Sequence, residues 1–373
     1  MTVRIAVPKE TRPNERRVAL VPGVVAKLSR LGTELHLETG AGDAALIPDA
    51  AYAKAGVTVG AARHDADIRM KVQPPTLDEA RQLREGSVLF SFVYAHREVE
   101  LVKLLRDRKI TCFAMELVPR ITRAQAMDAL SSQAALAGYY GALLAATHLA
   151  RILPMMTTAV GSIRPAKVLV MGLGVAGLQA LATARRLGAM VEGYDVRPET
   201  KEQAESLGAK FVDTGVDARG QGGYARELTA EEKAKVAEVL TKHIQQADAI
   251  ITTAAIPGRP SPKLISKAQV EGMKAGAVII DLAADGGGNC EYSQPGLTIR
   301  HGHVSIAAPY NVPSLLAEHA SELYAKNLLN LLELIIKDGV LKLDWEDEVV
   351  AKSCLTHGGE IKNEAAKKAV EGA

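Results

Sequence analysis

Residues 167–177 read KVLVMGLGVAG, a short apolar run followed by three glycines, Gly172, Gly174 and Gly177, in the spacing G-x-G-x-x-G. A turn of this kind between a strand and a helix is typical of a dinucleotide-binding βαβ unit. Its first glycine permits the tight turn, the second lets the pyrophosphate approach the backbone, and the third lets the helix pack closely on the strand. The helix expected over residues 178–187 then offers free N–H groups to the phosphates. This stretch predicts a Rossmann-type domain.

An acidic residue stands where such a domain needs one, because Asp195 ends the next expected strand, residues 190–194, 18 residues after Gly177. Its carboxylate can accept hydrogen bonds from both ribose hydroxyls and repels a 2′-phosphate, which favours NAD(H) over NADP(H). Arg197 could grip a 2′-phosphate, but a cation near the adenine rim fits better while Asp195 holds the sugar. We expect the cofactor to contact Gly172, Gly174, Val175, Ala176, Gly177, Asp195, Val196, Arg197, Thr253, Ala254 and Ala255.

The rest of the chain alternates between strand and helix periods, which predicts βαβ units and mainly parallel sheets. The expected fold is α/β, with two Rossmann-like, doubly wound parallel-sheet domains joined by long helices. We expect a first domain of residues 1–133 and 325–373, whose first strand lacks a glycine turn and is followed by Pro8 and Lys9. Residues 134–324 form the connector and the nucleotide domain.

Three segments outside the main alternation carry further expectations. The Ala/Leu-rich residues 132–152 predict a helix that Pro154 ends, since proline cannot continue a helix. Residues 313–336 predict a second long helix, with a possible returning strand over 340–343. The last residues, 358–373, predict a frayed tail or a helix.

The composition describes an ordinary globular chain, with 47% hydrophobic residues and a net charge of +2. Such a balance gives no broad basic field, so it argues against nucleic acid or an anionic membrane surface as partner. The three widely spaced cysteines show no C-x-x-C pair, so we expect reduced thiols and no metal site. The N-terminus lacks a signal-peptide pattern and the most apolar stretch, 134–149, is shorter than the roughly 20 residues of a membrane span, so we expect a cytoplasmic location.

Two polar segments lie where a site could form. Residues 119–133 read PRITRAQAMDALSSQ between an apolar strand and an apolar helix, either as a solvated loop with a helix cap or as part of a site. Residues 281–289 follow another strand, and their glycines 286–288 either make a flexible turn or contact a ligand.

Together these motifs resemble a known family. The run PRIxRAQxMDxLSSQ, the turn GLGVAGLQA, the GGYA of residues 222–225 and the IDLA…GGNC of residues 280–290 are similar to those of the NAD(H)-binding component of proton-translocating transhydrogenase, from Arg4 to about Thr356. The resemblance implies a homodimeric subunit without a membrane span. It binds NAD(H), docks a partner subunit that carries NADP(H), and lies at the membrane through a membrane subunit that couples hydride transfer to proton movement.

The resemblance also implies roles for individual residues. Asp128 and Ser131 orient the carboxamide and ring of the nicotinamide, Gln125 lies between the two nicotinamides, and Arg120 contacts the polar backbone of the cofactor. Gly220, Gly222, Gly223 and Tyr224 match a loop that closes over the nucleotide. Tyr139 matches a position near the site, although an aromatic residue on a helix is more often part of the core.

The alternative is a stand-alone enzyme like alanine dehydrogenase, a related family. Arg17 and Lys71 match residues that bind the amino-acid substrate there, and Asp285 also fits. Where that enzyme has its catalytic histidine, however, this chain has Tyr94, with His96 displaced by two residues. Hydride transfer between two nicotinamides needs approach and orientation but no such acid/base group, so we expect Arg17 and Lys71 to be structural. A nucleotide sensor without turnover is a third possibility.

Overall fold

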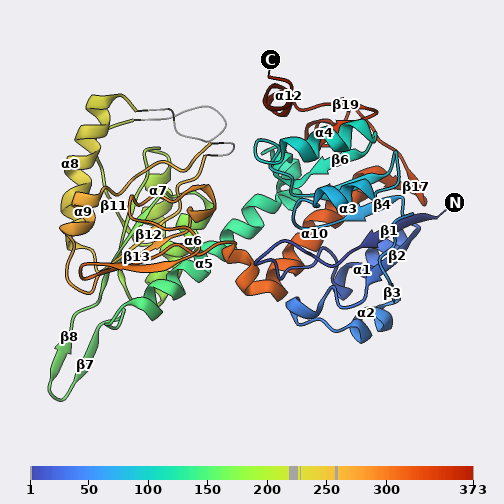
Figure 1. Cartoon of the computed structure of the whole chain (residues 1–373). Helices are drawn as coiled ribbons and strands as arrows, with labels where there is room; N and C mark the ends of the chain where they lie inside the picture. The colour runs from blue at the N-terminus through green and yellow to red at the C-terminus, as the bar shows by residue number, and fades with distance from the viewer. Residues whose placement is uncertain (1, 218–225, 227, 257–258, 373) are drawn as a thin grey trace. The chain divides into compact units, whose positions relative to one another are not determined.

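The computed structural model describes residues 2–217, 226, 228–256 and 259–372. The chain divides into two compact units, the first made of residues 1–133 and 314–373 and the second of residues 134–313. The first unit therefore combines N-terminal elements, blue to teal in Figure 1, with red C-terminal ones. The chain returns to it at Ser314, earlier than the residue 325 expected from the sequence, because the turn before the second long helix already packs there: Ser314 Oγ accepts from Arg16 N at 2.6 Å.

The first unit contains an eight-stranded sheet in which β1 to β6 are mutually parallel wherever they are neighbours. From one edge to the other the strands are β19 (Glu360–Ile361), β18 (Cys354–His357), β6 (Thr111–Ala114), β5 (Val88–Ser91), β4 (Ile68–Met70), β1 (Val3–Val7), β2 (Thr33–Glu38) and β3 (Thr58–Gly60). The chain winds outward from β1 in one direction, then outward from β4 in the other. This strand order is doubly wound, as predicted.

The helices of the first unit form where apolar residues recur at helical spacing. In α4 (Val99–Asp107), for example, Leu101, Val102 and Leu105 are buried on one face of the helix. The other helices are α1 (Pro22–Arg30), α2 (Asp49–Ala55), α3 (Leu77–Arg81), α10 (Ala317–Ile335), α11 (Glu348–Ser353) and α12 (Glu364–Glu371).

The second unit contains a seven-stranded sheet, parallel except for its last pair. Its order is β11 (Lys210–Phe211), β10 (Met190–Tyr194), β9 (Lys167–Met171), β12 (Ala249–Thr252), β13 (Val278–Asp281), β15 (Val304–Ala307) and β14 (Thr298–His301). Its helices are α6 (Val175–Arg186), α7 (Thr200–Ser206), α8 (Ala230–Gln246) and α9 (Lys267–Glu271). The winding direction reverses between β9 and β12, and ligands of open α/β sheets bind beyond the carboxyl ends of the strands at such a point.

Two long helices lie near the points where the chain passes between units, as predicted. Helix α5 (Ala129–His148) begins three residues before the expected start because Asp128 caps it, accepting a hydrogen bond from Ser131 N at 2.9 Å. Helix α10 begins at Ala317, after the 3₁₀ turn Val312–Leu316.

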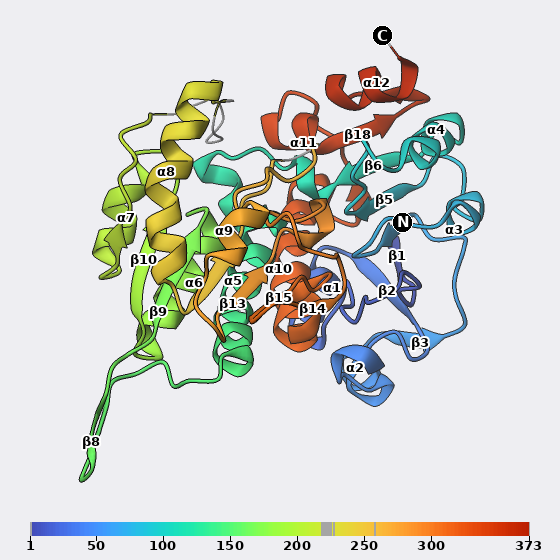
Figure 2. The ribbon, with the colours of Figure 1, turned by 60° about the vertical axis from the view of Figure 1, so that its left-hand side comes forward.

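The sequence predicted a strand at residues 340–343 but not its pairing, and it missed a hairpin in the second unit. Strand β17 (Val340–Leu341) pairs only with β16 (Ile336–Lys337) in the described part of the chain, so it does not return to the sheet as predicted. The returning strand is β18, antiparallel to β6. Strands β7 (Met156–Thr158) and β8 (Gly161–Ile163) form an unpredicted hairpin that projects from the sheet of the second unit in both views (Figures 1 and 2).

Candidate functional site

The glycine turn of the second unit connects β9 to α6, as the sequence predicted. Gly172 has a φ of +92°, a backbone conformation that disfavours any side chain. A Cβ on Gly177 would lie 1.7 Å from the carbonyl oxygen of Gly172, so only glycine lets α6 approach the strand this closely. Glycine is also required where α5 approaches α6, because a Cβ on Gly138 would lie 2.0 Å from Ala176 O. No sequence motif had singled out Gly138.

Gly174 differs from the other two glycines of the turn. Among the described residues, apart from its chain neighbours, a Cβ built on it meets no atom within 4 Å, and its φ of −75° suits any residue. Gly174 is also the N-cap of α6, and no side chain caps the helix there. Since glycine has no side chain that could bond the N–H groups of the first helical turn, this helix N-terminus suits a phosphate.

Asp195 follows β10 and is buried beside the turn. Its Oδ2 accepts a hydrogen bond from Leu173 N at 2.7 Å, which fixes the carboxylate against the glycine turn. Arg197 donates to the same carboxylate through its backbone N, Nε and Nη2, each at 2.9 Å. In this structure the guanidinium thus lies on Asp195, where the sequence predicted a cation nearer the adenine rim.

The strand across the reversal point, β12, is tied to the turn by Thr253, whose Oγ1 donates to Gly172 O at 2.8 Å. The next residue, Ala254, is held by Asn289, which accepts from its N at 3.0 Å and donates to its O at 2.8 Å. Thr253, Ala254 and the glycine turn therefore form one edge, as predicted, and Asn289 is a supporting residue that the sequence analysis did not single out.

The glycine-rich segment after β13 is a packed turn. Buried Asp281 accepts from Asn289 N at 2.7 Å, Cys290 N at 3.0 Å and Ser293 Oγ. A Cβ on Gly286 would lie 2.2 Å from Ser261 Oγ, and one on Gly288 would lie 2.7 Å from Asp281 Oδ2. Close packing therefore requires glycine at two of these three positions. This favours the interpretation of the segment as a turn over that of a ligand contact.

The polar loop before α5 lies in the first unit. Its residues Arg120, Gln125, Asp128 and Ser131, with Pro119 and Ile121, line one cavity of about 380 Å³. The four side chains singled out in the sequence are thus brought together.

Contacts at both ends anchor this loop. Arg123 makes a bidentate ion pair with Asp347, with distances of 2.8 and 2.6 Å. Asn327 on α10 donates to Ala126 O at 2.9 Å and accepts from Ser132 Oγ at 2.7 Å. Within the cavity, Ser131 donates to Asp128 through its N at 2.9 Å and its Oγ at 2.6 Å. The 3₁₀ turn Thr122–Met127 between these anchors presents Gln125 to solvent.

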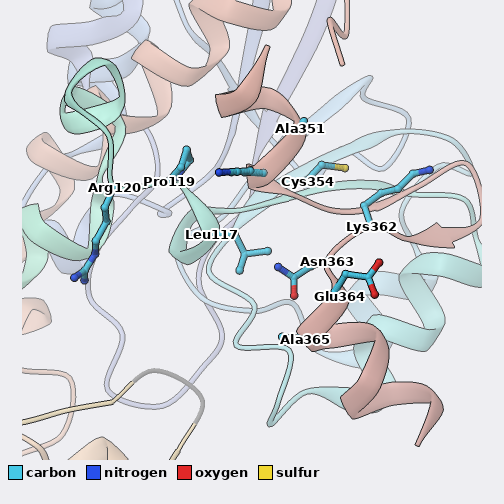
Figure 3. Close-up of a pocket in the computed structure, with 10 residues that line it drawn as sticks. Leu117, Pro119, Arg120, Ala351, Cys354, Lys362, Asn363, Glu364 and Ala365 are labelled. Atoms are coloured by element: carbon cyan, nitrogen blue, oxygen red, sulfur yellow. The ribbon is translucent and has the colours of Figure 1, made fainter. Parts of the chain in front are cut away.

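A second cavity of about 600 Å³ adjoins this loop in the first unit and shares Pro119 and Arg120 with the first (Figure 3). Leu117 and Asn363 both line it, and the first residues of α12 form one side. Its remaining lining residues are Ala351, Lys352, Cys354, Lys362, Glu364 and Ala365. Burial raises the pKa of the Cys354 thiol to about 12, which disfavours the thiolate form.

Comparison with known proteins identifies the family. Residues 6–137 match the model of the alanine dehydrogenase/PNT N-terminal domain, and residues 141–364 match that of the C-terminal domain. The chain belongs to the alanine dehydrogenase/PNT family, a family of oxidoreductases.

Relatives of both kinds occur within the alanine dehydrogenase/PNT family. An NAD(P) transhydrogenase subunit alpha chain of Rhodospirillum rubrum is 49% identical over 96% of this chain and 97% of its own length. A crystal structure of transhydrogenase from Sinorhizobium meliloti superposes with a TM-score of 0.88 at 45% identity, over 96% of this chain and 99% of that one. Alanine dehydrogenase of Mycobacterium tuberculosis is 34% identical over 79% of this chain and 76% of its own length.

Arg17 and Lys71, which the sequence related to the alanine dehydrogenase branch of the family, are buried and paired with carboxylates. Arg17 makes a bidentate ion pair with Glu15, at 2.8 and 2.6 Å, and donates to Gln133 at 2.8 Å. Lys71 lies 3.4 Å from Glu10 and 3.1 Å from Glu79. Because the chain supplies these anions itself, both cations are already neutralised. The pairing favours a structural role.

Tyr94 and His96 lie where the sequence was compared with the catalytic histidine of alanine dehydrogenase. Tyr94 follows β5 with a φ of +54°, rare for an aromatic residue, and its N donates to the half-buried Glu116. The His96 side chain is largely exposed. Loss of water around its covered part, together with the nearby charge of Arg97, lowers the pKa of the imidazole. The described residues that line the two cavities of the first unit include no histidine.

Other expectations have mixed outcomes. Tyr139 is 40% exposed, so the alternative interpretation, that its side chain is part of the core, is wrong. Gly220, Gly222, Gly223 and Tyr224 lie outside the described residues. Within the described ranges there is no group of three His, Cys, Asp or Glu side chains that could hold a metal ion. In that same part of the chain, every helix is too short or too polar to cross a bilayer.

Proposed function

We propose that this chain is the NAD(H)-binding subunit of a proton-translocating transhydrogenase. It binds NAD(H) at the Gly172–Gly177 turn and passes hydride directly to NADP⁺ held on a separate subunit, while a membrane subunit couples this step to proton movement. The observation that carries the proposal is the loop that gathers Arg120, Gln125, Asp128 and Ser131 at one cavity. The names of the relatives that match nearly the whole chain support it.

The residues of the turn fit a dinucleotide. Gly174 leaves open space beside an uncapped helix N-terminus, which suits the pyrophosphate. Asp195, held against the turn by Leu173, suits the adenosine ribose. Val175, Ala176, Val196, Thr253, Ala254 and Ala255 complete the proposed contact set. Bound NAD(H) supplies the hydride.

The loop residues orient the nicotinamide in this proposal. Asp128 already accepts two hydrogen bonds from Ser131, one on each oxygen, so each oxygen retains an acceptor position for a carboxamide N–H. Ser131 donates its only hydroxyl hydrogen to Asp128, and its oxygen can still accept. A primary amide offers two N–H donors, so Asp128 and Ser131 present acceptors that match it.

Gln125 and Arg120 act outside this pair. Gln125 is exposed at the cavity rim, where its amide can lie between the nicotinamide and that of the partner subunit, while the Arg120 guanidinium suits the polar backbone of the cofactor. Hydride transfer between two ring carbons needs close approach and exclusion of water rather than a proton donor. The described lining of the cavity, which includes no histidine, is consistent with that need.

We further propose that the subunit is a homodimer and that a second copy covers the β7–β8 hairpin. All six strand residues of the hairpin are exposed, and Val160 and Ile163 are 99% and 51% exposed. An isolated two-stranded hairpin is marginally stable in water, so a partner that buries these apolar side chains would stabilise it. In the complex the chain would lie on the cytoplasmic side of the membrane, attached through its partner subunits.

Mixing the purified chain with its NADP-binding partner tests the main proposal. NADH should then reduce an NADP⁺ analogue whose reduced form has its own absorbance, at a rate far above that of either protein alone. No rate above the separate proteins refutes the proposal.

The same preparation tests the alternative. Pyruvate and ammonia should cause no NADH oxidation by the chain alone, because Arg17 and Lys71 are already neutralised by Glu15, Glu10 and Glu79. Turnover with these substrates would instead establish an amino-acid dehydrogenase.

A further inference from the structure

The carboxylate of Asp195 receives four hydrogen bonds from its own chain. Oδ2 accepts from Leu173 N and from Arg197 Nη2, at 2.7 and 2.9 Å. Oδ1 accepts from the backbone N and the Nε of Arg197, both at 2.9 Å. A carboxylate has about four lone-pair positions. The acceptor capacity of the residue proposed to hold the ribose is therefore already filled.

Two of these four donors are fixed and two are not. The N–H of Leu173 belongs to the glycine turn, and the N–H of Arg197 belongs to the backbone just after β10. Nε and Nη2 of Arg197, in contrast, belong to a side chain, 20% exposed, whose torsions can change without moving the backbone. The ribose of a dinucleotide also presents two donors, its 2′- and 3′-hydroxyls. The two side-chain donors of Arg197 therefore equal in number the two ribose hydroxyls that would replace them.

We propose that the guanidinium of Arg197 competes with the adenosine ribose for Asp195, and that NAD(H) binds by displacing it. This inference rests on the proposed binding of NAD(H) at the turn. The displaced side chain stays beside the ribose edge, because the backbone N–H of Arg197 remains bonded to Oδ1. From there its charge can reach a 2′-phosphate. Arg197 accordingly lowers affinity for NADH and also weakens the rejection of NADPH by Asp195.

Calorimetric titration of the full chain with NADH and with NADPH tests this competition. In the wild type, NADH must break the hydrogen bonds between Arg197 and Asp195, which lowers its affinity, although hydration of the released guanidinium recovers part of this loss. Arg197→Ala avoids this cost and should bind NADH about three- to tenfold more tightly. The same variant should bind NADPH more weakly. Arg197→Lys, which keeps the charge but loses the bidentate geometry, should show a smaller gain for NADH.

A double-mutant comparison shows whether the gain acts through Asp195. In an Asp195→Asn background, Arg197→Ala should change NADH affinity by less than about twofold, because the competed carboxylate is gone. Arg186→Ala, which removes an exposed arginine at the end of α6, is the matched control and should change neither affinity.

The outcomes separate this inference from the proposal on which it rests. Weaker NADH binding by Arg197→Ala, or an equal gain in the Asp195→Asn background, overturns the competition while leaving NAD(H) binding intact. A wild-type chain that does not bind NADH refutes the proposed function, and the competition with it.

Discussion

Two glycines of one turn should respond in opposite ways to the same substitution by alanine. In Gly177→Ala the new Cβ would lie 1.7 Å from Gly172 O. A normal non-bonded contact needs about 3.5 Å, so α6 would have to retreat from β9 by about 1.8 Å, at a cost of about 3 kcal/mol or more. In Gly174→Ala the Cβ meets no atom of the other described residues within 4 Å. There the loss of unfolded-chain entropy, about 0.4–1 kcal/mol, offsets the poorer N-cap.

The two variants should therefore separate stability from cofactor binding. Gly177→Ala should lower the denaturant midpoint of the second unit, measured by circular dichroism during urea unfolding. Gly174→Ala should unfold within about 1 kcal/mol of the wild type, yet bind NADH at least about tenfold more weakly by calorimetry, because its methyl group fills the space into which the pyrophosphate must fit.

Either result could fail independently. A Gly177→Ala chain as stable as the wild type would show that α6 does not approach β9 as closely as described. A Gly174→Ala chain that keeps full NADH affinity would show that the phosphates do not bind above Gly174, and the proposed site would have to move.

Three further predictions concern other regions. Gln125→Asn should lower the rate of hydride transfer to the partner by about tenfold or more, because it misplaces one ring against the other, and should leave the Kd for NADH unchanged; equal losses in both would contradict a positioning role. Burial opposes ionisation of Glu15, but hydrogen bonds and charge from Arg17 outweigh it and lower its pKa to about 2 from the usual 4.5. The stability that Glu15 contributes should be present above pH 4.5 and lost as the pH falls through about 2, and Glu15→Gln should flatten that part of the unfolding profile. Val160→Asp should shift the chain toward monomer in sedimentation velocity, whereas Val340→Asp, at an exposed position of β17, should not.

The local features of the fold could be predicted from the sequence because local chemistry determines them. The strand at residues 3–7, the glycine turn and the position of Asp195 each follow from a period, a spacing or a strand end. Arg120, Gln125, Asp128 and Ser131, which the sequence analysis named together, line one cavity, but only the family resemblance suggested roles for them.

Features that depend on long-range pairing were missed. Nothing in residues 354–357 indicates that they pair with β6, more than 240 residues earlier, and the apolar residues 340–343 looked equally suitable. Asn289 is important because it bonds to Ala254, 35 residues away, and Gly138 because it approaches α6 closely. The sequence analysis assigned Arg197 to the adenine because it could not show that the side chain folds back on Asp195.

Each of the two units contains its own doubly wound sheet, but the residues at the strand ends differ in chemistry. This difference supports the proposal that the cofactor binds to the second unit. After β1 of the first unit come Pro8 and Lys9, and buried pairs such as Lys71 with Glu10 fill the strand ends. Lys71, the cation at these strand ends, is already flanked by Glu10 and Glu79, so the chain's own carboxylates occupy the place that a phosphate would need. After β9 of the second unit the glycine turn leaves the space at Gly174 open to a phosphate. The chemistry of the strand ends therefore supports placing the phosphates of the proposed cofactor on the second unit, where the glycine turn leads into the N-terminus of α6.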